Sequence, residues 1–130
     1  FPNCYNQMDL FVRCDINHGY QFSVMEAAAC GVPVICTDSG NTKQLTDAGG
    51  GILVPHKEGN WEPKELAKTA KAIRKAVEQL RDNPDKRLEM GAKGREFVVN
   101  NYTWDKFIPS WRAFFREGLA NARKVQDLSQ

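Results

Sequence analysis

Short apolar runs alternate with helical patterns over the first 56 residues of the chain. Three of these runs have the length and the β-branched content of strands: Asp9–Asp15, Pro33–Thr37 and Gly51–Pro55. Helical patterns lie between them at Ser23–Cys30, which a glycine and a proline follow, and at Thr42–Asp47, which Ala-Gly-Gly-Gly follows. This order of elements favours parallel pairing through right-handed crossovers. We therefore predict an α/β fold with about three parallel strands, half of a doubly wound sheet.

The rest of the chain has helical patterns only. From Pro63 onward an apolar residue recurs every three or four positions, with charged residues opposite: Leu66, Ala70, Ile73, Val77 and Leu80. The segment Asn83–Lys86 breaks this helix, and we predict a second helix over about Lys86–Asn100. A third should begin after Thr103, a good N-cap residue. The sheet should thus have flanking helices and a helical C-terminal tail.

The third predicted helix carries an apolar stripe: Trp104, Phe107, Ile108, Trp111, Phe114, Phe115 and Leu119. Pro109 lacks the N–H that would bond to residue 105, so we expect the helix to kink or break there. After Ala122 the chain should fray. We therefore assign one domain to residues 1–122, with a strand-helix part at 1–56 and a helical part at 63–122, followed by a frayed tail at 123–130.

Two features predict that further structure covers this domain. A three-stranded parallel sheet has open edges, and an apolar helix face needs something to lie on. The chain also begins at Phe1 rather than at a methionine. We expect it to be part of a longer protein, with the Trp104–Phe115 face packed on the missing part. The alternative is that a second copy covers this face, giving a homodimer.

Composition excludes several classes of protein. A length of 130 residues with 42% hydrophobic and 26% charged residues is typical of one soluble globular domain. Eighteen basic and sixteen acidic residues give a net charge of +2, interleaved along the helices. This pattern favours a solvated surface over a nucleic-acid or anionic-membrane partner. No apolar run approaches the roughly 18 residues of a membrane span, and no signal peptide is apparent, so we expect a cytoplasmic protein.

The four cysteines show no Cys-x-x-Cys spacing and lie in apolar surroundings: Cys4, Cys14, Cys30 and Cys36. We interpret them as buried free thiols in a reducing compartment, in preference to zinc ligands or a catalytic cysteine. His18 and His56 lie too far apart in the sequence to suggest a metal site. We predict neither a metal nor a cofactor.

The turn after the first predicted strand, Ile-Asn-His-Gly-Tyr-Gln, leads into a helix at the edge where parallel sheets bind ligands. Gly19 would let the chain turn closely, and the N–H groups of residues 21–24 would point at an anion. Glu26, one turn along, could accept hydrogen bonds from a vicinal diol such as that of ribose. The loop Thr37–Thr42 would line the same crevice. The alternative is a simple turn, with Glu26 solvated or complementing the helix dipole; for Glu26 alone the pattern favours that alternative.

The segment Tyr5–Pro55 resembles the nucleotide-sugar-binding half of the C-terminal domain in retaining glycosyltransferases of family four, which have the GT-B fold. The most specific part is Met-Glu-Ala-Ala-Ala-Cys-Gly-Val-Pro-Val-Ile-Cys-Thr-Asp-Ser-Gly. The family's trailing helices, with an Asp-Pro break and a Tyr-Ser/Thr-Trp start to the last one, are similar to residues 82–107. The similarity extends from Tyr5 to about Leu119.

The resemblance implies a role for each matching residue. Glu26 matches the second Glu of the family's Glu-x7-Glu motif, which binds the ribose hydroxyls, and His18 falls where the first Glu contacts the donor sugar. The helix start, whose N–H groups hold the diphosphate, corresponds to Gly19, Tyr20, Gln21, Phe22, Ser23 and Val24. The second loop contributes Ser39, Gly40 and Asn41. The family's basic residues for the diphosphate and its acceptor site match nothing in this sequence.

Four departures from the family pattern cluster at the donor site. His18 cannot copy both acceptors of a carboxylate, and Gln21 replaces a Gly close to the phosphates. Asn41 replaces the second Gly of a Gly-Gly turn, and Gln44 replaces the Glu that follows it. These departures affect catalysis more than fold.

The resemblance implies the donor-binding part of a retaining, metal-independent glycosyltransferase that uses a nucleotide-diphospho-sugar such as a UDP- or GDP-sugar. Alone, the chain should not transfer sugar. One alternative is a stand-alone, non-catalytic binding or oligomerisation module derived from the same fold. Another, less favoured, is a sugar-nucleotide epimerase. The base, the sugar and the acceptor are not predicted.

Overall fold

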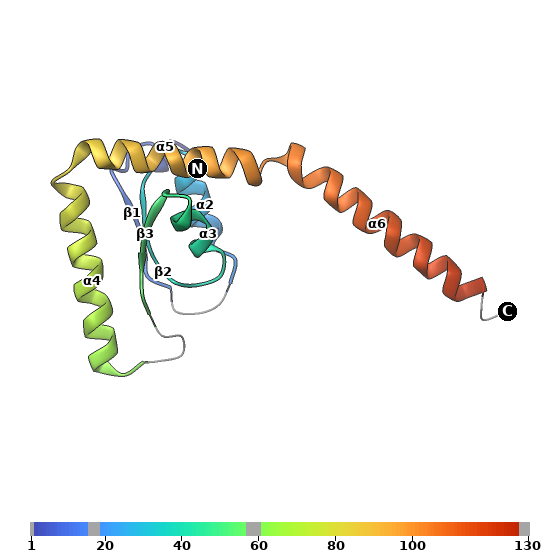
Figure 1. Ribbon diagram of the computed structural model, residues 1–130, viewed down its shortest axis with the longest axis horizontal. Helices are drawn as coiled ribbons and strands as arrows, with labels where there is room; N and C mark the ends of the chain where they lie inside the picture. The colour runs from blue at the N-terminus through green and yellow to red at the C-terminus, as the bar shows by residue number, and fades with distance from the viewer. Residues whose placement is uncertain (1, 16–18, 57–60, 128–130) are drawn as a thin grey trace. The chain divides into compact units, whose positions relative to one another are not determined.

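The computed structural model of the protein describes residues 2–15, 19–56 and 61–127. The chain divides into two compact units, Phe1–Val99 and Asn100–Gln130. The first contains the sheet and most of the helices, and the second contains the last helix (Figure 1). The elements in chain order are α1 (Pro2–Tyr5), β1 (Phe11–Arg13), α2 (Phe22–Ala29), β2 (Val34–Thr37), α3 (Thr42–Asp47), β3 (Gly51–Val54), α4 (Pro63–Arg81), α5 (Pro84–Asn101) and α6 (Trp104–Asp127).

The sheet has three parallel strands in the order β1-β2-β3, joined by α2 and α3. Val34 in β2 pairs with Phe11 in β1 and with Gly51 in β3. The predicted α/β fold with about three parallel strands is therefore confirmed. The first strand is shorter than its apolar pattern, since β1 begins at Phe11 and ends at Arg13.

Strand β2 is buried along its whole length, as expected for a strand covered on both faces. Side chains alternate along a strand, so neighbouring residues of β2 face opposite layers. Figure 1 shows the strands between α4 on one side and α2 and α3 on the other. The core on the α4 side is built from Ile35, Val54, Ala76, Leu80 and Met90.

Helices α4 and α5 belong to the same compact unit as the strands. They supply Ala76, Leu80 and Met90 to the core of the sheet. The chain divides between Val99 and Asn100, and the boundaries expected from the sequence, one domain over 1–122 with parts at 1–56 and 63–122, stay a prediction. Pro63 is the first residue of α4, where its missing N–H costs no helical hydrogen bond.

Helices α2 and α3 are each followed by a glycine in the left-handed region. After α2, Gly31 has a φ of 78° and donates to Ala28 O at 2.9 Å, while Val32 donates to Ala27 O at 3.0 Å. This pair of bonds is a Schellman motif, and Gly49 makes the equivalent turn after α3. The helix ends that the sequence predicted are therefore confirmed, and both turns lead directly toward the next strand.

Helix α5 crosses the amino ends of β2 and β3 so closely that its backbone contacts the turns before these strands. A Cβ placed on Gly91 would lie 2.0 Å from Gly31 O, and one placed on Gly94 would lie 3.3 Å from Gly50 Cα. The Arg95 guanidinium also donates to the carbonyl of the last residue of α2. Glycines thus let α5 close the amino edge of the sheet and leave the carboxyl edge to the connecting loops.

The second unit is described by α6, which runs unbroken from Trp104 to Asp127. The helix is therefore not broken at Pro109, although the hydrogen bond to residue 105 is missing; the kink that was the other expectation stays a prediction. Thr103 precedes the helix as predicted, and its carbonyl accepts from the N–H groups of Lys106 and Phe107. Residues 123–127, where fraying was expected, are helical, and 128–130 lie outside the described residues.

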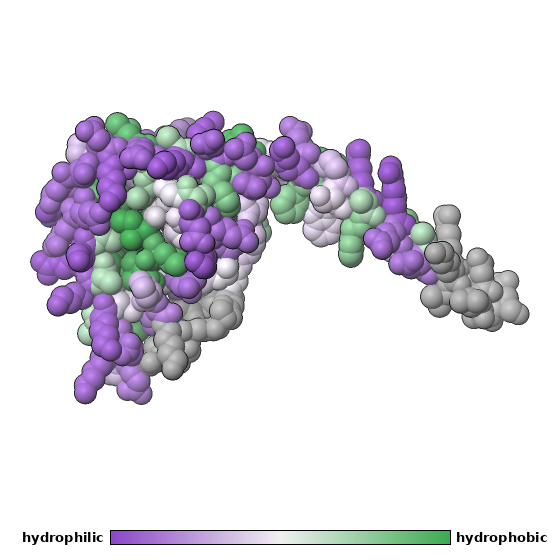
Figure 2. Space-filling model, in the orientation of Figure 1, coloured by the Kyte–Doolittle hydropathy of each residue, from purple (hydrophilic) through white to green (hydrophobic). Residues whose placement is uncertain are grey.

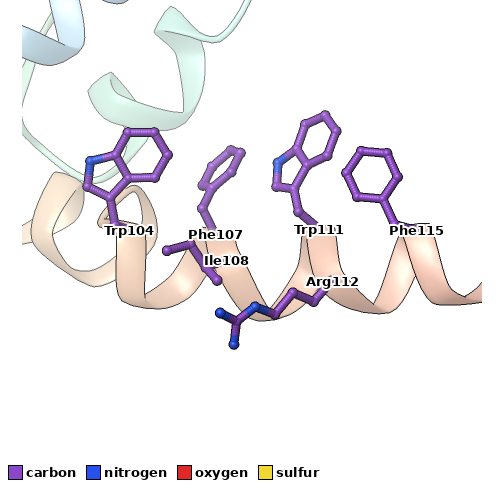
Figure 3. Close-up of a pocket in the computed structure, with 6 residues that line it drawn as sticks. All are labelled: Trp104, Phe107, Ile108, Trp111, Arg112 and Phe115. Carbon is purple, nitrogen blue, oxygen red and sulfur yellow. The ribbon is translucent and has the colours of Figure 1, made fainter.

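One side of α6 is apolar and exposed. A groove of about 310 Å³ there is lined by five apolar residues and one arginine: Trp104, Phe107, Ile108, Trp111, Phe115 and Arg112. The four aromatic side chains point to the same side of the helix (Figure 3). The side chain of Trp104 is 78% exposed and that of Phe114 is 66% exposed. The stripe that the sequence predicted is therefore present, and all seven of its residues are exposed.

The surface of the first unit is mixed. On the face seen in Figure 2, hydrophilic residues lie along α4 and hydrophobic ones gather over the strands beside it. Val12, in the edge strand β1, is 38% exposed. Within the described part of the chain, no helix combines the length and apolar character needed to cross a membrane.

The cysteines differ from their expected burial. Cys36 in β2 is buried, and Cys30 is half-buried, but Cys4 and Cys14 are exposed. Cys4 lies in the one-turn helix α1, and Cys14 directly follows the edge strand β1. All four are free thiols.

We predict that Gly91→Ala lowers the free energy of unfolding by about 1–3 kcal/mol, because the new methyl group would overlap the Gly31 carbonyl. Urea unfolding followed by circular dichroism measures this. Gly118→Ala is the matched control, since a Cβ there meets nothing within 4 Å and alanine favours a helix by about 1 kcal/mol. A Gly91→Ala protein as stable as the unchanged chain would contradict the close packing of α5.

Candidate functional site

The candidate site lies at the carboxyl edge of the sheet, where the segment after β1 meets the segment after β2. Loops that follow parallel strands gather at this edge, which is where such sheets bind ligands. His18, predicted to contact a donor sugar, lies outside the described residues, so its role stays a prediction. We use the name carboxyl-edge site for the described residues Arg13, Asp15, Gly19–Val24, Glu26 and Ser39–Asn41.

The two loops touch through their backbones. Gly40 has a φ of 57°, and a Cβ on it would lie 1.9 Å from the carbonyl oxygen of Gly19. A Cβ on Gly19 would meet nothing within 4 Å. The close approach therefore depends on Gly40, although the sequence had suggested Gly19 as the residue that permits the tight turn.

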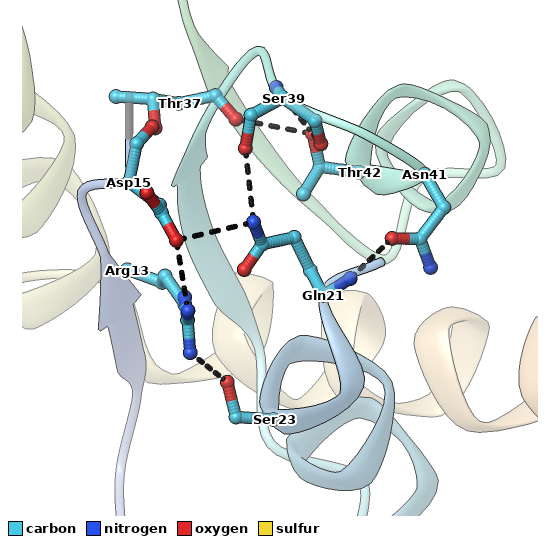
Figure 4. Close-up of polar contacts among 8 residues, drawn as sticks. All are labelled: Arg13, Asp15, Gln21, Ser23, Thr37, Ser39, Asn41 and Thr42. Carbon is cyan, nitrogen blue, oxygen red and sulfur yellow. Dashed lines mark hydrogen bonds and ion pairs between the residues drawn. The ribbon is translucent and has the colours of Figure 1, made fainter. Parts of the chain in front are cut away.

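Gln21 ties the loops together at the start of α2 (Figure 4). Its N–H donates to Asn41 Oδ1 at 2.7 Å, and its Nε2 lies 3.3 Å from both Asp15 Oδ2 and Ser39 Oγ. The Gln21 side chain is only 2% exposed, so it fills the gap between the loops. Two buried atoms here, Gln21 Oε1 and Asn41 Nδ2, have no hydrogen-bond partner among the described residues.

Arg13 joins the end of β1 to the first turn of α2. Its guanidinium donates to Asp15 Oδ2 at 2.9 Å and to Ser23 Oγ at 2.6 Å. The ion pair is partly exposed and contributes little to stability, about 1 kcal/mol at most. Its main effect is to fix the orientation of the Asp15 carboxylate, which also accepts from Gln21.

The turn between β2 and α3 is fixed by two buried threonines. Thr42 Oγ1 accepts from the Ser39 N–H at 3.2 Å and lies 3.0 Å from Thr37 O and 2.9 Å from Ser39 O, one of which takes its proton. The Thr37 hydroxyl donates to the carbonyl of Asp15. Thr37 and Thr42 thus hold the second loop at its two ends, and Thr37 also contacts the first loop at Asp15.

The first turn of α2 offers fewer free N–H groups than the sequence suggested. The Gln21 N–H is taken by Asn41, and the Phe22 N–H donates to Tyr20 O at 3.1 Å. The N–H groups of Ser23 and Val24 lie in the first turn, where no intrahelical acceptor exists, and the N-cap residue makes no side-chain bond to them. These two groups, with the positive end of the helix dipole, are of the kind that can accept an anion.

Glu26 lies one turn into α2, and its side chain is exposed. Its Oε2 accepts a hydrogen bond from the Tyr5 hydroxyl at 2.8 Å. Burial, and then the hydrogen bond to Glu26, raise the pKa of Tyr5 to about 12. The reasoning from the sequence missed this partner, although Tyr5 begins the segment that resembles the glycosyltransferase pattern.

The other predicted site residues have different surroundings. Tyr20 and Phe22 form an exposed aromatic pair with ring centroids 4.6 Å apart. The Val24 side chain is fully buried, so only its backbone can face a ligand. His56 lies apart, after β3, with Nδ1 3.1 Å from Thr69 Oγ1. Within the described ranges, no group of three or more His, Cys, Asp or Glu residues is placed to hold a metal ion.

Comparisons with known proteins agree with this architecture. Residues 1–113 match the family described as glycosyl transferase-like. A curated relative is 33% identical over 81 residues, 62% of this chain and 18% of its own length: a GDP-mannose-dependent monoacylated alpha-(1-6)-phosphatidylinositol monomannoside mannosyltransferase of Corynebacterium glutamicum. The solved structure of sucrose-phosphate synthase from Thermosynechococcus elongatus matches 91% of this chain and 27% of its own, with a TM-score of 0.71 and 22% identity.

These matches show the fold of the chain and the share of each relative that the chain covers. At 22% identity the structural likeness concerns the fold alone, and it confirms a Rossmann-like half of the GT-B architecture. The chain spans about a fifth of the curated relative and about a quarter of the solved structure.

We predict that Gly40→Ala separates the two loops, because the methyl group would overlap Gly19 O and the left-handed φ is strained for alanine. The free energy of unfolding should fall by about 1–3 kcal/mol. Amide NMR resonances of residues 19–21 should also shift. Gly19→Ala is the matched control: its Cβ enters open space, so it should leave the free energy of unfolding unchanged and should not shift the amide resonances of residues 39–41 across the contact. A larger effect from Gly19→Ala than from Gly40→Ala would refute the proposed contact.

The raised pKa of Tyr5 predicts a loss of stability in alkali. A tyrosine in the unfolded chain ionises near pH 10, whereas Tyr5 in the folded chain ionises near 12. The stabilising contribution is therefore complete below pH 10 and disappears as the pH rises to 12. Urea unfolding over this range should show a steeper decline for the unchanged chain than for Tyr5→Phe. Equal slopes would show that the phenol is not held in its neutral form.

Proposed function

The chain belongs to the family of glycosyl transferase-like proteins, and we propose that its carboxyl-edge site binds the nucleoside diphosphate of a nucleotide-sugar donor. The observation that carries this proposal is the contact of Gly40 with Gly19, which brings a second loop against the open first turn of α2. On α2 itself, the first turn, which would bind the diphosphate, and Glu26, which would bind the ribose hydroxyls, lie one helical turn apart.

The diphosphate would bind at the start of α2. The N–H groups of Ser23 and Val24 would donate to phosphate oxygens, and the helix dipole favours negative charge there. Arg13 is already paired with Asp15, so the described part of the site relies on backbone dipoles more than on a side-chain cation. When the sugar leaves, the same N–H groups would stabilise the charge that develops on the diphosphate.

The ribose would bind to Glu26. An ionised carboxylate accepts about four hydrogen bonds, and Tyr5 uses one of these positions. The remaining positions suit two vicinal hydroxyl groups. Ser39, Gly40 and Asn41 would line the site opposite α2, and His18 would approach the donor sugar as the resemblance implies.

The intact enzyme would transfer a sugar from this donor with retention of configuration and without a metal. Because the chain spans 18% of the mannosyltransferase that it resembles, we propose that acceptor binding and transfer need further parts of a longer protein and that this chain alone is inactive. Because that relative is GDP-mannose-dependent, a guanosine diphosphate donor is the first to test.

We predict that Glu26→Gln weakens binding of the preferred nucleoside diphosphate by about 10- to 100-fold, since hydrogen bonds to a charged group contribute about 1.5–3 kcal/mol. Isothermal titration calorimetry with GDP, UDP and ADP measures both the preference and the loss.

Glu96→Gln removes an equivalent exposed carboxylate from α5 and should bind like the unchanged chain. Circular dichroism should show that both variants fold. Unchanged affinity of the Glu26→Gln protein, or no binding of any of the three nucleotides at millimolar concentration, would refute the proposed donor site.

A further inference from the structure

We infer that Tyr5 is a positioning residue that fixes the Glu26 carboxylate for recognition of ribose hydroxyls. This inference rests on the proposed function and adds the residue on which ribose selectivity depends. Tyr5 comes from the four-residue helix α1, 21 positions before Glu26 in the sequence.

Packing holds the Tyr5 ring in place. Tyr5 is 8% exposed, and its ring packs edge-on against Phe11 of β1, with centroids 5.8 Å apart and an interplanar angle of 71°. A ring wedged in this way has few rotamers open to it, so its hydroxyl occupies a fixed point. The hydrogen bond of 2.8 Å from that point to Glu26 Oε2 transmits the constraint to the carboxylate.

Glu26 needs such a partner because its side chain is exposed and has three rotatable bonds. No other hydrogen bond or ion pair to it is formed in the part of the chain that the structure describes. Without Tyr5 the carboxylate would sample several rotamers, and a ligand would have to order it on binding. With Tyr5 in place, one oxygen is anchored and the other is free for a diol.

The direction of the hydrogen bond is also fixed. Tyr5 is the donor, because its phenol keeps its proton at neutral pH as any tyrosine does; burial and the neighbouring carboxylate raise its pKa to about 12 and extend this into alkali. A donor to Oε2 leaves Glu26 an acceptor toward the ligand. The pair is thus matched to groups that donate hydrogen bonds, as both ribose hydroxyls do.

The test compares two nucleotides on four proteins. The affinity of GDP is divided by that of 2′,3′-dideoxy-GDP, which lacks both ribose hydroxyls, for the unchanged chain, Tyr5→Phe, Glu26→Gln and Tyr102→Phe. We expect the ratio to fall about 3- to 10-fold in Tyr5→Phe, the worth of one ordinary hydrogen bond. The affinity of the dideoxy nucleotide should stay the same. Tyr102→Phe removes a hydroxyl from the segment between α5 and α6 and should keep the full ratio.

The outcomes separate the inference from the function on which it rests. If Glu26→Gln lowers the ratio and Tyr5→Phe does not, the inference fails and the donor site stands. An equal loss of both nucleotides in Tyr5→Phe means a structural role and also overturns the inference. If Glu26→Gln leaves the ratio unchanged, the ribose assignment itself fails. Phenylalanine keeps the ring against Phe11, and amide NMR spectra of Tyr5→Phe check that the fold is retained.

Discussion

Burial of the central strand is the constraint on which the rest of the structure depends. All four residues of β2 are buried, so the strand must be covered on both faces and paired on both edges. Helix α4 covers one face, α2 and α3 cover the other, and α5 closes the amino edge through Gly91 and Gly94. Both loops of the candidate site leave the sheet at the opposite, carboxyl edge.

The same constraint explains why the site is held so tightly. The loop after β2 cannot move without its strand, and Thr42 ties that loop back to the last residue of β2. Gly40 brings it against Gly19, and Gln21 fills the gap with hydrogen bonds to Ser39 and to Asp15 on the other side. These contacts therefore hold the first turn of α2 in a fixed position. Preorganised N–H groups of this kind bind an anion with little loss of entropy.

Much of the fold follows from local patterns in the sequence. The apolar runs predicted the strands, and the glycine turns at Gly31 and Gly49 marked the ends of both short helices. A run without charged residues, such as Val34–Thr37, also indicated burial on both faces. The break expected at Pro109 did not occur, since the helix of 24 residues continues on both sides of the proline without the hydrogen bond to residue 105.

The contacts of the candidate site are harder to derive from a sequence. The helix that carries Tyr5 has four residues, too few for a periodic pattern, and its partner Glu26 is 21 positions away. The inward turn of the Gln21 side chain depends on acceptors from two separate loops. Exposure of Cys4 and Cys14 likewise depends on how short elements sit at the edge of the sheet. Such pairings are decided by tertiary structure, which periodicity does not encode.

The central claim is that the carboxyl-edge site binds a nucleoside diphosphate. Its most direct test is a map of amide NMR shifts in this chain, labelled with ¹⁵N and titrated with GDP. The account predicts shifts confined to residues 19–26 and 37–42, largest at Ser23 and Val24. A second groove lies after β3, lined by Pro55, His56, Thr69 and residues near them. Shifts centred on that groove, or on the apolar face of α6, would contradict the account.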